Sequence, residues 1–279
     1  MNALAVTTAP AQQRGGRLAA VAETVSDAVT MTARSVRLAT RDLDSMITAV
    51  VLPVMILAMF TLVFGGAIDV GVDYVTYATP GIILLCAGFG AANTALAVEQ
   101  DMSRGMVDRL RSLPMRSWTV LLGHVGASLL KNLVTTVIVF GFAVLFGFRP
   151  TADLAGWFGA VGLILLFVGA IAWTAAFVGV VARSADAAGA FSFVAMFLPY
   201  ISSAFVPVET MPGWLQGFAQ HQPTTPIIET VRGLLVPGTP GAVSGYELGT
   251  TALQAVAWCL GIAVVFAALA ARGYRRRGR

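Results

Sequence analysis

Residues 156–181 read GWFGAVGLILLFVGAIAWTAAFVGVV and contain no charged side chain. About 20 apolar residues are enough for a helix to cross a bilayer, so this run predicts a membrane-spanning helix. Of the 279 residues in the chain, 57% are apolar and 11% are charged, whereas soluble domains carry roughly 45–50% and about 25%. The composition therefore excludes an ordinary water-soluble domain.

Five further apolar runs have lengths that suit a bilayer, at about 46–64, 77–98, 118–148, 188–206 and 251–271. They are continuous rather than alternating, and only helices satisfy their own backbone groups in hydrocarbon. We therefore expect an all-α polytopic membrane protein with six transmembrane helices, forming a domain at 46–272. Residues 1–45 predict a tail and an N-terminal interfacial amphipathic helix, and residues 273–279 predict a second, basic tail.

The cationic residues are distributed unevenly between the two sides of this arrangement. The connections on one side hold fifteen Arg and Lys residues and those on the other hold two, while Lys131 falls within a span. By the positive-inside rule, both termini are expected to be cytoplasmic, with the chain in the cytoplasmic (inner) membrane. Two termini on the same side of the membrane require an even number of spans. We attribute the arginine excess to codon bias and expect no nucleic-acid partner.

The connection between the second and third runs has two faces. Its apolar stripe has spacings of four, four and three, at Met102, Met106, Leu110 and Leu113. Charges of alternating sign occupy the other face, at Asp101, Arg104, Asp108 and Arg111. Such a pattern predicts a short amphipathic helix at the inner membrane surface, with a flat place at Gly105 and an end at Pro114. An ordinary solvated loop is the alternative.

The connection from Val206 to about Thr250 is too apolar for a simple loop and too rich in proline for a span. Thr225 and Pro226 are typical of the cap and first turn of a helix, and we expect two short re-entrant helices here. Glu229 and Arg232, three residues apart, are expected to pair on the polar side of the second. Such backbone at membrane depth is tolerated only beside protein or a water-filled cavity, which predicts a position beside a pathway.

Polar groups within the spans are few, and each is a candidate functional group because a charge at the bilayer centre costs about 2.5 kcal/mol or more. Lys131 and His124 share a helical face and are expected to line a pathway or a subunit interface, with snorkelling of the ammonium as the alternative. Asn93 is a candidate for the same pathway or for an interhelical hydrogen bond. Cys86 and Cys259 lie in apolar runs and are expected to be small buried hydrophobes.

Taken together, the motifs resemble the membrane subunit of ABC-2 type exporters, especially the daunorubicin-resistance permease branch. The strongest likeness is residues 197–214, FLPYISSAFVPVETMPGW, continuing through HQPTTP at 221–226 to RGLL at 232–235. It includes the candidate outer-gate residues Pro207, Met211, Pro212, Trp214, Pro223, Pro226 and Arg232, to which the spacing to Arg232 adds Glu229. A second likeness, to the family's cytoplasmic coupling helix, consists of Glu99, Gly105, Leu110 and Pro114. Together with the charged face of the same stretch, it gives the candidate coupling residues Glu99, Asp101, Arg104, Gly105, Asp108, Arg111 and Pro114.

The resemblance implies a dimer, with a second copy or a close paralogue, and two ABC ATP-binding subunits docked beneath. It also implies export of a hydrophobic or amphipathic substrate such as a drug, lipid, glycolipid or polyketide. A P-loop needs a glycine-rich turn before Lys and Ser/Thr, and the sole lysine lies in SLLKN at 128–132. We therefore expect no ATPase site and no cofactor in this chain, with ATP and Mg²⁺ bound by the partner subunit.

Three other functions are alternatives. An ion-coupled secondary transporter normally needs carboxylates or broken helices near the midplane, and no Asp or Glu is expected deep in a span. A membrane enzyme would need clustered His, Asp, Glu or Cys, but the two histidines, His124 and His221, are far apart and no metal-ligand spacing occurs. An ABC importer would continue Glu99 with two alanines, where Gln100 and Asp101 stand.

Overall fold

The computed structural model describes residues 17–39, 43–103, 119–238 and 247–276, and all regular structure within them is helical. Five helices of the described residues are long and apolar enough to cross a membrane. They are α2 (Leu43–Ala58) with the π-helix that continues it (Met59–Phe64), α3 (Tyr74–Ser103), α5 (Thr119–Leu145), α6 (Leu154–Val181) and α10 (Leu248–Arg276). The remaining α-helices of the described residues are α1 (Arg17–Ala39), α7 (Ala185–Phe197), α8 (Gly213–His221) and α9 (Thr224–Leu235). This is the architecture of a multi-pass membrane protein.

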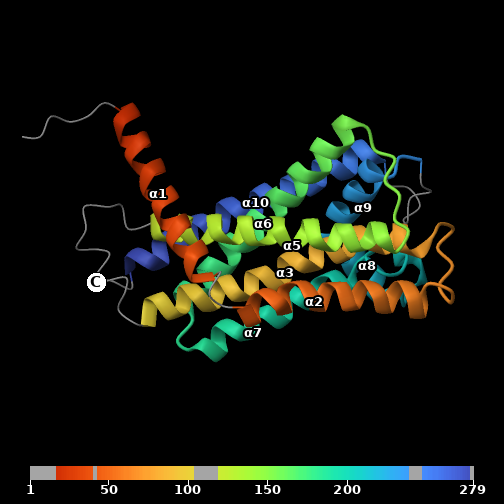
Figure 1. Ribbon diagram of the computed structural model, residues 1–279, viewed down its shortest axis with the longest axis horizontal. Helices are drawn as coiled ribbons and strands as arrows, with labels where there is room; N and C mark the ends of the chain where they lie inside the picture. Colours follow the sequence, from red (N-terminus) through yellow and green to blue (C-terminus); the bar gives the residue numbers. More distant parts are fainter. Residues whose placement is uncertain (1–16, 40–42, 104–118, 239–246, 277–279) are drawn as a thin grey trace, which may run out of the picture.

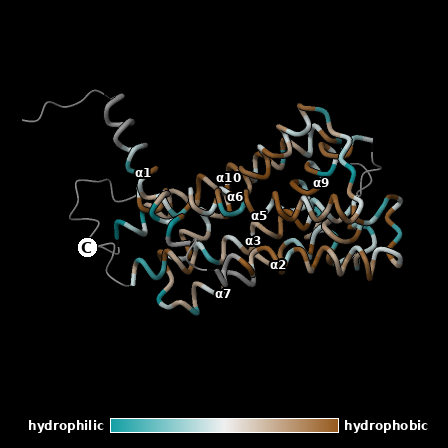
Figure 2. Tube along the Cα trace, in the orientation of Figure 1, coloured by the Kyte–Doolittle hydropathy of each residue, from teal (hydrophilic) through white to brown (hydrophobic). Residues whose placement is uncertain are grey.

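The long helices run side by side along the longest axis of the molecule (Figure 1). Helix α1 and the C-terminal end of α10 lie at one end of the bundle, and α8 and α9 lie at the other. We call these the α1 end and the α9 end. Hydrophobic residues dominate the middle of the long helices, while hydrophilic residues gather at the α1 end and in the connections opposite (Figure 2).

Helix α3 occupies the centre of the bundle and packs against α2, α5, α6, α7 and α9. Two-thirds of its apolar window (67%) is buried inside the protein, compared with 11% for α2 and for α10. The outer helices therefore expose large apolar side chains such as Met55, Val137 and Val264. A soluble protein rarely exposes so much contiguous apolar surface, and a bilayer is the solvent that suits it.

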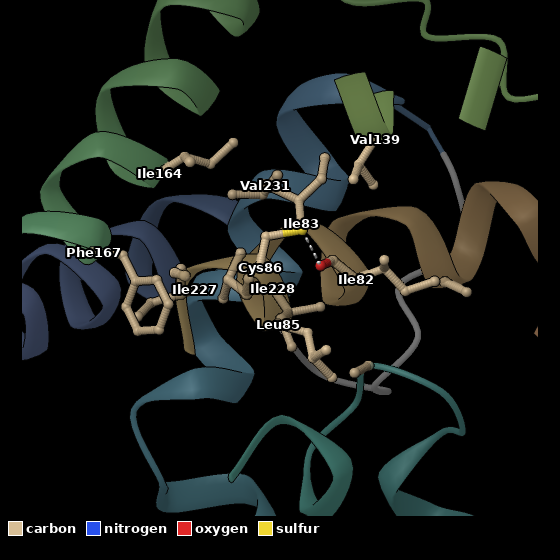
Figure 3. Packing of buried hydrophobic residues seen from close by; sticks show 14 of the residues in the cluster. Ile82, Ile83, Leu85, Cys86, Val139, Ile164, Phe167, Ile227, Ile228 and Val231 are labelled. Atoms are coloured by element: carbon tan, nitrogen blue, oxygen red, sulfur yellow. Dashed lines mark hydrogen bonds between the residues drawn. The ribbon is translucent and has the colours of Figure 1, made fainter. Parts of the chain in front are cut away.

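The main core lies where α3 meets α5, α6 and α9 (Figure 3). Ile82, Ile83 and Leu85 of α3 are almost fully buried there, beside Ile227 and Ile228 of α9. Both cysteines are free and buried, as expected, and the Cys86 thiol donates to the Ile82 carbonyl oxygen of its own helix at 3.2 Å. Helix α9 is thus part of the core, although it is only 12 residues long.

Glycines bring α3 close to its neighbours. A Cβ atom on Gly90 would lie 2.2 Å from the Asn132 Nδ2 atom of α5, and one on Gly88 would lie 3.1 Å from the Ala195 carbonyl oxygen of α7. Small residues at helix interfaces allow this kind of backbone approach in membranes. Gly90 therefore lets the Asn132 side chain of α5 lie directly against α3, and Gly88 lets the backbone of α7 approach it.

Helix α1 packs against the beginning of α5. The contact is close because Gly123 has no side chain: a Cβ there would lie 2.6 Å from the Met31 Cβ. Met31 and Ser35 are buried, while Val29 is 62% exposed. The predicted N-terminal helix is confirmed, with one face on the bundle, and its position at a membrane surface stays a prediction.

The fifth predicted span, 188–206, has a different form from the other five. Helix α7 ends at Phe197 after 13 residues and is followed by a 3-10 turn, Leu198–Ile201, with Pro199 in it. Proline lacks the amide hydrogen that a continuing α-helix requires. The described residues therefore contain five helices that are long enough to cross a membrane and a shorter apolar helix at this position, and the count of six crossings stays a prediction.

Candidate functional site

At the α9 end, Arg232 lies at the centre of a buried polar cluster, which we call the Arg232 hub (Tyr77, Ser203, Glu229 and Arg232). The side chain of Arg232 is only 2% exposed. Its guanidinium donates to the Tyr77 carbonyl oxygen from Nε at 3.2 Å and from Nη2 at 2.9 Å, and to the Ser203 carbonyl oxygen from Nη2 at 2.9 Å. Its Nη1 donates to the Glu229 carboxylate.

The guanidinium of Arg232 also lies 4.0 Å from the centre of the Tyr77 ring, a cation–π distance. An ionic pair in a low-dielectric interior is stable only when further hydrogen bonds satisfy its remaining groups. The two backbone carbonyls and the ring provide that here. One arginine thereby links α3, α9 and the segment that follows α7.

That segment, residues 198–206, has little regular structure, and side chains from other elements satisfy its backbone. Gln222 donates to the carbonyl oxygens of Leu198 and Ile201, at 3.2 and 2.7 Å. The Tyr74 hydroxyl donates to the Phe205 carbonyl oxygen at 2.9 Å. Because an unsatisfied backbone group in hydrocarbon costs several kcal/mol, these side chains are what permit irregular backbone at this position.

At the α1 end, Asp101 of α3 joins two other helices in what we call the Asp101 triad (Arg34, Asp101 and His124). Arg34 of α1 donates to both carboxylate oxygens of Asp101, at 3.1 and 3.5 Å. His124 of α5 places Nε2 3.1 Å from one of them. The side chains are 26%, 18% and 8% exposed, respectively, so this cluster is less deeply buried than the Arg232 hub.

Next to the triad, a cavity of about 210 Å³ opens among α1, α2, α3 and α5. His124, Lys131 and Asn93 are among its lining residues, so the structure brings together the three polar groups that the sequence suggested for a pathway or interface. A second cavity, of about 150 Å³ between α5 and α6, is lined almost entirely by apolar side chains such as Leu133, Phe140 and Trp157.

The sequence profile of the ABC-2 type transporter family matches residues 27–236, a region that contains both clusters and the cavity. The chain belongs to the ABC-2 type transporter family. Two relatives of this ABC-2 chain align with most of its length. It is 29% identical over 234 residues to a daunorubicin resistance ABC transporter permease protein of Streptomyces coeruleorubidus, covering 83% of this chain and 80% of the relative.

A second relative is a probable doxorubicin resistance ABC transporter permease protein of Mycobacterium tuberculosis. It is 28% identical over 278 residues, covering 98% of this chain and 95% of the relative. The likeness to this branch of permeases is therefore confirmed. It extends over the whole ABC-2 domain and is not restricted to the motif after the fifth run.

The ABC-2 chain's predicted coupling residues fall into two groups. Glu99 is 6% exposed and Asp101 is held in the triad, so either could support a docking surface from inside. The others, Arg104, Gly105, Asp108, Arg111 and Pro114, lie outside the described residues. Their role stays a prediction.

The ABC-2 chain's predicted outer residues are placed on a compact segment. Pro207, Pro212 and Pro223 directly precede the 3-10 turn Val208–Thr210, α8 and α9, respectively. Met211 packs on Val208 and Ala219, while Trp214 is 82% exposed on α8. Glu229 and Arg232 were expected to pair on the polar side of α9. They do pair, but inside the protein, so the predicted location is wrong. Pro226 is buried beside them in α9.

One further expectation is wrong in detail. Thr225 does not cap α9, which begins at Thr224, and its hydroxyl donates to the Ala219 carbonyl oxygen instead. The prediction also missed Tyr74, Tyr77, Ser203 and Gln222. Tyr74, Tyr77 and Gln222 carry no signal of their own in the sequence, because each is linked to its partner through a backbone carbonyl that no local pattern reveals, and Ser203 takes part through its own carbonyl oxygen.

Proposed function

We propose that this ABC-2 permease is the membrane subunit of an ATP-driven exporter, with ATP hydrolysed by a separate subunit. The observation that carries the proposal is the family match over residues 27–236 on a chain whose long apolar helices are exposed on the outside of the bundle. The names of the relatives refer to resistance to daunorubicin and doxorubicin. They support a hydrophobic or amphipathic substrate in the same broad class.

In this proposal the chain crosses the inner membrane six times, with α7 and its 3-10 turn as the fifth crossing. Both termini are cytoplasmic, so the α1 end faces the cytoplasm. Helices α8 and α9 then form a re-entrant segment at the outer face. Two permease subunits, identical or closely paralogous, stand side by side over two ATP-binding subunits that bind ATP and Mg²⁺.

The predicted coupling segment, 99–116, is the proposed contact with the ATP-binding subunit. The described part of this segment, residues 99–103, supports this role, because Asp101 connects the end of α3 to α1 and α5. A displacement of this segment would therefore reach three helices at once. The route from there to the outer segment runs along α3, which packs against α9 as well.

Affinity purification in mild detergent tests the proposed assembly. The full chain, tagged at one terminus, is isolated from its native host, and co-purifying proteins are identified by mass spectrometry. We expect an ABC ATP-binding subunit in amounts comparable to the chain, with ATPase activity in the eluate. Recovery of the folded chain without any nucleotide-binding protein, under conditions that preserve a known ABC complex, would contradict the proposal.

A further inference from the structure

The cavity at the α1 end is unusually polar for its place among the apolar helices α2, α3 and α5. Eight of its eighteen described lining residues carry a polar side chain: Ser35, Asn93, Thr94, His124, Ser128, Lys131, Asn132 and Thr135. The cavity between α5 and α6 has only one hydroxyl in its described lining, that of Thr136. Polar groups within membrane helices are costly and mark functional sites by default, so the first cavity is the better candidate for a binding site.

The polar groups of α5 form one wall of this cavity. Ser128, Asn132 and Thr135 are spaced four and three residues apart, which places them on one face of the helix. Each of them is less than 9% exposed. Asn93 of α3 lines the same cavity, and Gly90, one turn before it, lets the Asn132 side chain lie against α3. The polar wall therefore lies where α3 and α5 meet.

A different face of α5 supplies an apolar rim to the same cavity. Leu130, Val134 and Ile138 line it and are 49%, 54% and 37% exposed, respectively. Their spacing of four residues makes them a continuous stripe. The cavity is therefore continuous with the apolar outside of the bundle, and a molecule dissolved in the bilayer reaches the polar wall along this stripe.

The polar groups that remain available to a ligand are uncharged. His124 places Nε2 3.1 Å from the Asp101 carboxylate, and Lys131 has an interaction of its own. The Asn93 amide and the Thr135 hydroxyl, in contrast, have no hydrogen-bond partner among the described residues. Amides and hydroxyls both donate and accept. They match a hydroxyl group, which also does both, better than a carboxylate that only accepts or an ammonium that only donates.

The volume of the cavity limits the size of what it holds. It measures about 210 Å³, and an apolar cavity of about 150 Å³ is known to bind benzene. The space therefore suits a small head group and not a large fused ring system. A ligand that enters a polar cavity must also replace the hydrogen bonds of the water there, which favours a head group with several hydroxyls.

We propose that this cavity binds an uncharged amphiphile with a small, hydroxyl-bearing head group that enters from the lipid. The head group exchanges hydrogen bonds with Asn93 and Thr135, and the hydrocarbon chain lies along the stripe of Leu130, Val134 and Ile138. The inference rests on the proposed export function for the fate of the molecule, but the binding step itself requires no ATP.

Binding to the purified chain in phosphatidylcholine nanodiscs tests this site. Four probes carry the same fluorophore on a 16-carbon chain and end in a vicinal diol, the dimethyl ether of that diol, a carboxylate or a primary amine. We expect the diol to bind about tenfold more tightly than the ether, which cannot donate a hydrogen bond. Equal affinity for the diol and the ether, or tighter binding of either charged probe, would overturn the proposal.

Two neighbouring threonines supply a matched pair of variants. Thr135→Val removes a hydroxyl from the polar wall and should lower the ratio of diol affinity to ether affinity, as should Asn93→Leu. Thr136→Val makes the same change one residue later, where the side chain lines the cavity between α5 and α6, and should leave the ratio unchanged. The ratio compares two probes on one preparation, so a smaller folded fraction does not alter it. An unchanged ratio in both Thr135→Val and Asn93→Leu, or an equal decrease in Thr136→Val, would contradict the site.

Photo-crosslinking of the unmodified chain covers the case in which a variant does not fold. A diazirine beside the diol should label peptides of α3 around residues 90–97 or of α5 around residues 128–135, and labelling only elsewhere would overturn the site. The outcome is independent of the proposed function. A chain that binds the diol probe but recruits no ATP-binding subunit refutes export and leaves the site standing, and the reverse result does the opposite.

Discussion

Arg232 at the α9 end and Asp101 at the α1 end each join three segments, but in different surroundings. The Arg232 side chain is 2% exposed and is held by two backbone carbonyls, a carboxylate and an aromatic ring. The Asp101 side chain is 18% exposed, bound to side chains alone, and adjoins a cavity. A buried charge is costly to disturb, whereas a partly hydrated one can exchange partners.

This difference assigns different mechanical roles to the two ends. The Arg232 hub joins α3, α9 and residues 198–206 into a single unit, so in the proposed dimer the outer face is expected to open between the two subunits. The Asp101 triad connects elements that can shift relative to one another at small cost. In the proposed assembly, the ATP-binding subunit acts at the α1 end, where the ionic contacts are easier to rearrange.

The largest loss of stability is expected from Arg232→Met. This change leaves the Glu229 carboxylate buried without its cation and removes the three hydrogen bonds to backbone carbonyls. We expect it to lower the free energy of unfolding by about 3–5 kcal/mol. Thermal unfolding and size-exclusion chromatography of the purified protein in detergent measure the loss. The control is Arg183→Met, because Arg183 is exposed and should tolerate the change.

The double variant Glu229→Gln/Arg232→Met sharpens that result. Removing both charges leaves no uncompensated ion, so the double variant should be more stable than Arg232→Met alone. Stability of Arg232→Met equal to that of the unmodified chain would show that the Arg232 hub is not a structural unit.

A smaller loss of stability is expected from Gly81→Val in α3, near the Arg232 hub. A Cβ at this position would lie 2.5 Å from the Ala204 Cβ and 2.8 Å from its Cα. The segment after α7 must therefore move, which should lower the free energy of unfolding by about 1–3 kcal/mol. Gly162→Val in α6 is the matched control, because nothing lies within 4 Å of its Cβ position. Equal melting temperatures for the two variants would refute close packing at the α9 end.

Asp101→Asn should change global stability by only about 1 kcal/mol or less, since the pair with Arg34 is partly exposed. Its effect should appear locally, as faster hydrogen exchange in α1 while α9 is unchanged. Asp27→Asn on α1 is the control, because the structure gives Asp27 no contact with α3 or α5 among the described bonds. Unchanged exchange in α1 would contradict the linking role of Asp101.

The smallest effect on the folded subunit is expected from charge reversal in the predicted coupling segment, Arg104→Glu/Arg111→Glu. We expect a normal melting temperature but transport uncoupled from ATP hydrolysis, measured as substrate moved per ATP in reconstituted vesicles. Arg275→Glu/Arg276→Glu at the end of α10 is the control for net charge. Normal coupling in the first variant would remove the segment from the docking surface.

The sequence was sufficient for the long helices because their signal is local. Continuous runs such as 156–181 predict helices wherever they occur, and α6 agrees with its run to within two residues at its beginning. The passage at 188–206 was less predictable, since its apolar composition hides the proline-induced end of α7. Its backbone is satisfied in part by side chains of α3, α9 and the α8–α9 junction, and in part by the side chain of Ser202 within the segment.

The candidate sites were predictable to a smaller extent. The pairing of Glu229 with Arg232 follows from their spacing, but its burial depends on Tyr77, which is 155 residues away from Arg232 in the chain. The shared face of His124 and Lys131 was visible in one helix. The cavity that they line requires α1, α2 and α3 as well, and no local pattern reports how those helices converge.

Vectorial transport in proteoliposomes tests the central claim, that this permease is driven from its α1 end by a separate ATP-hydrolysing subunit. The purified chain is reconstituted with and without the co-purified ATP-binding subunit, and accumulation of a fluorescent amphiphile is followed after addition of Mg-ATP. The account predicts ATP-dependent accumulation only when both proteins are present. Equal accumulation by the chain alone, driven by ATP or by an imposed ion gradient, would contradict it.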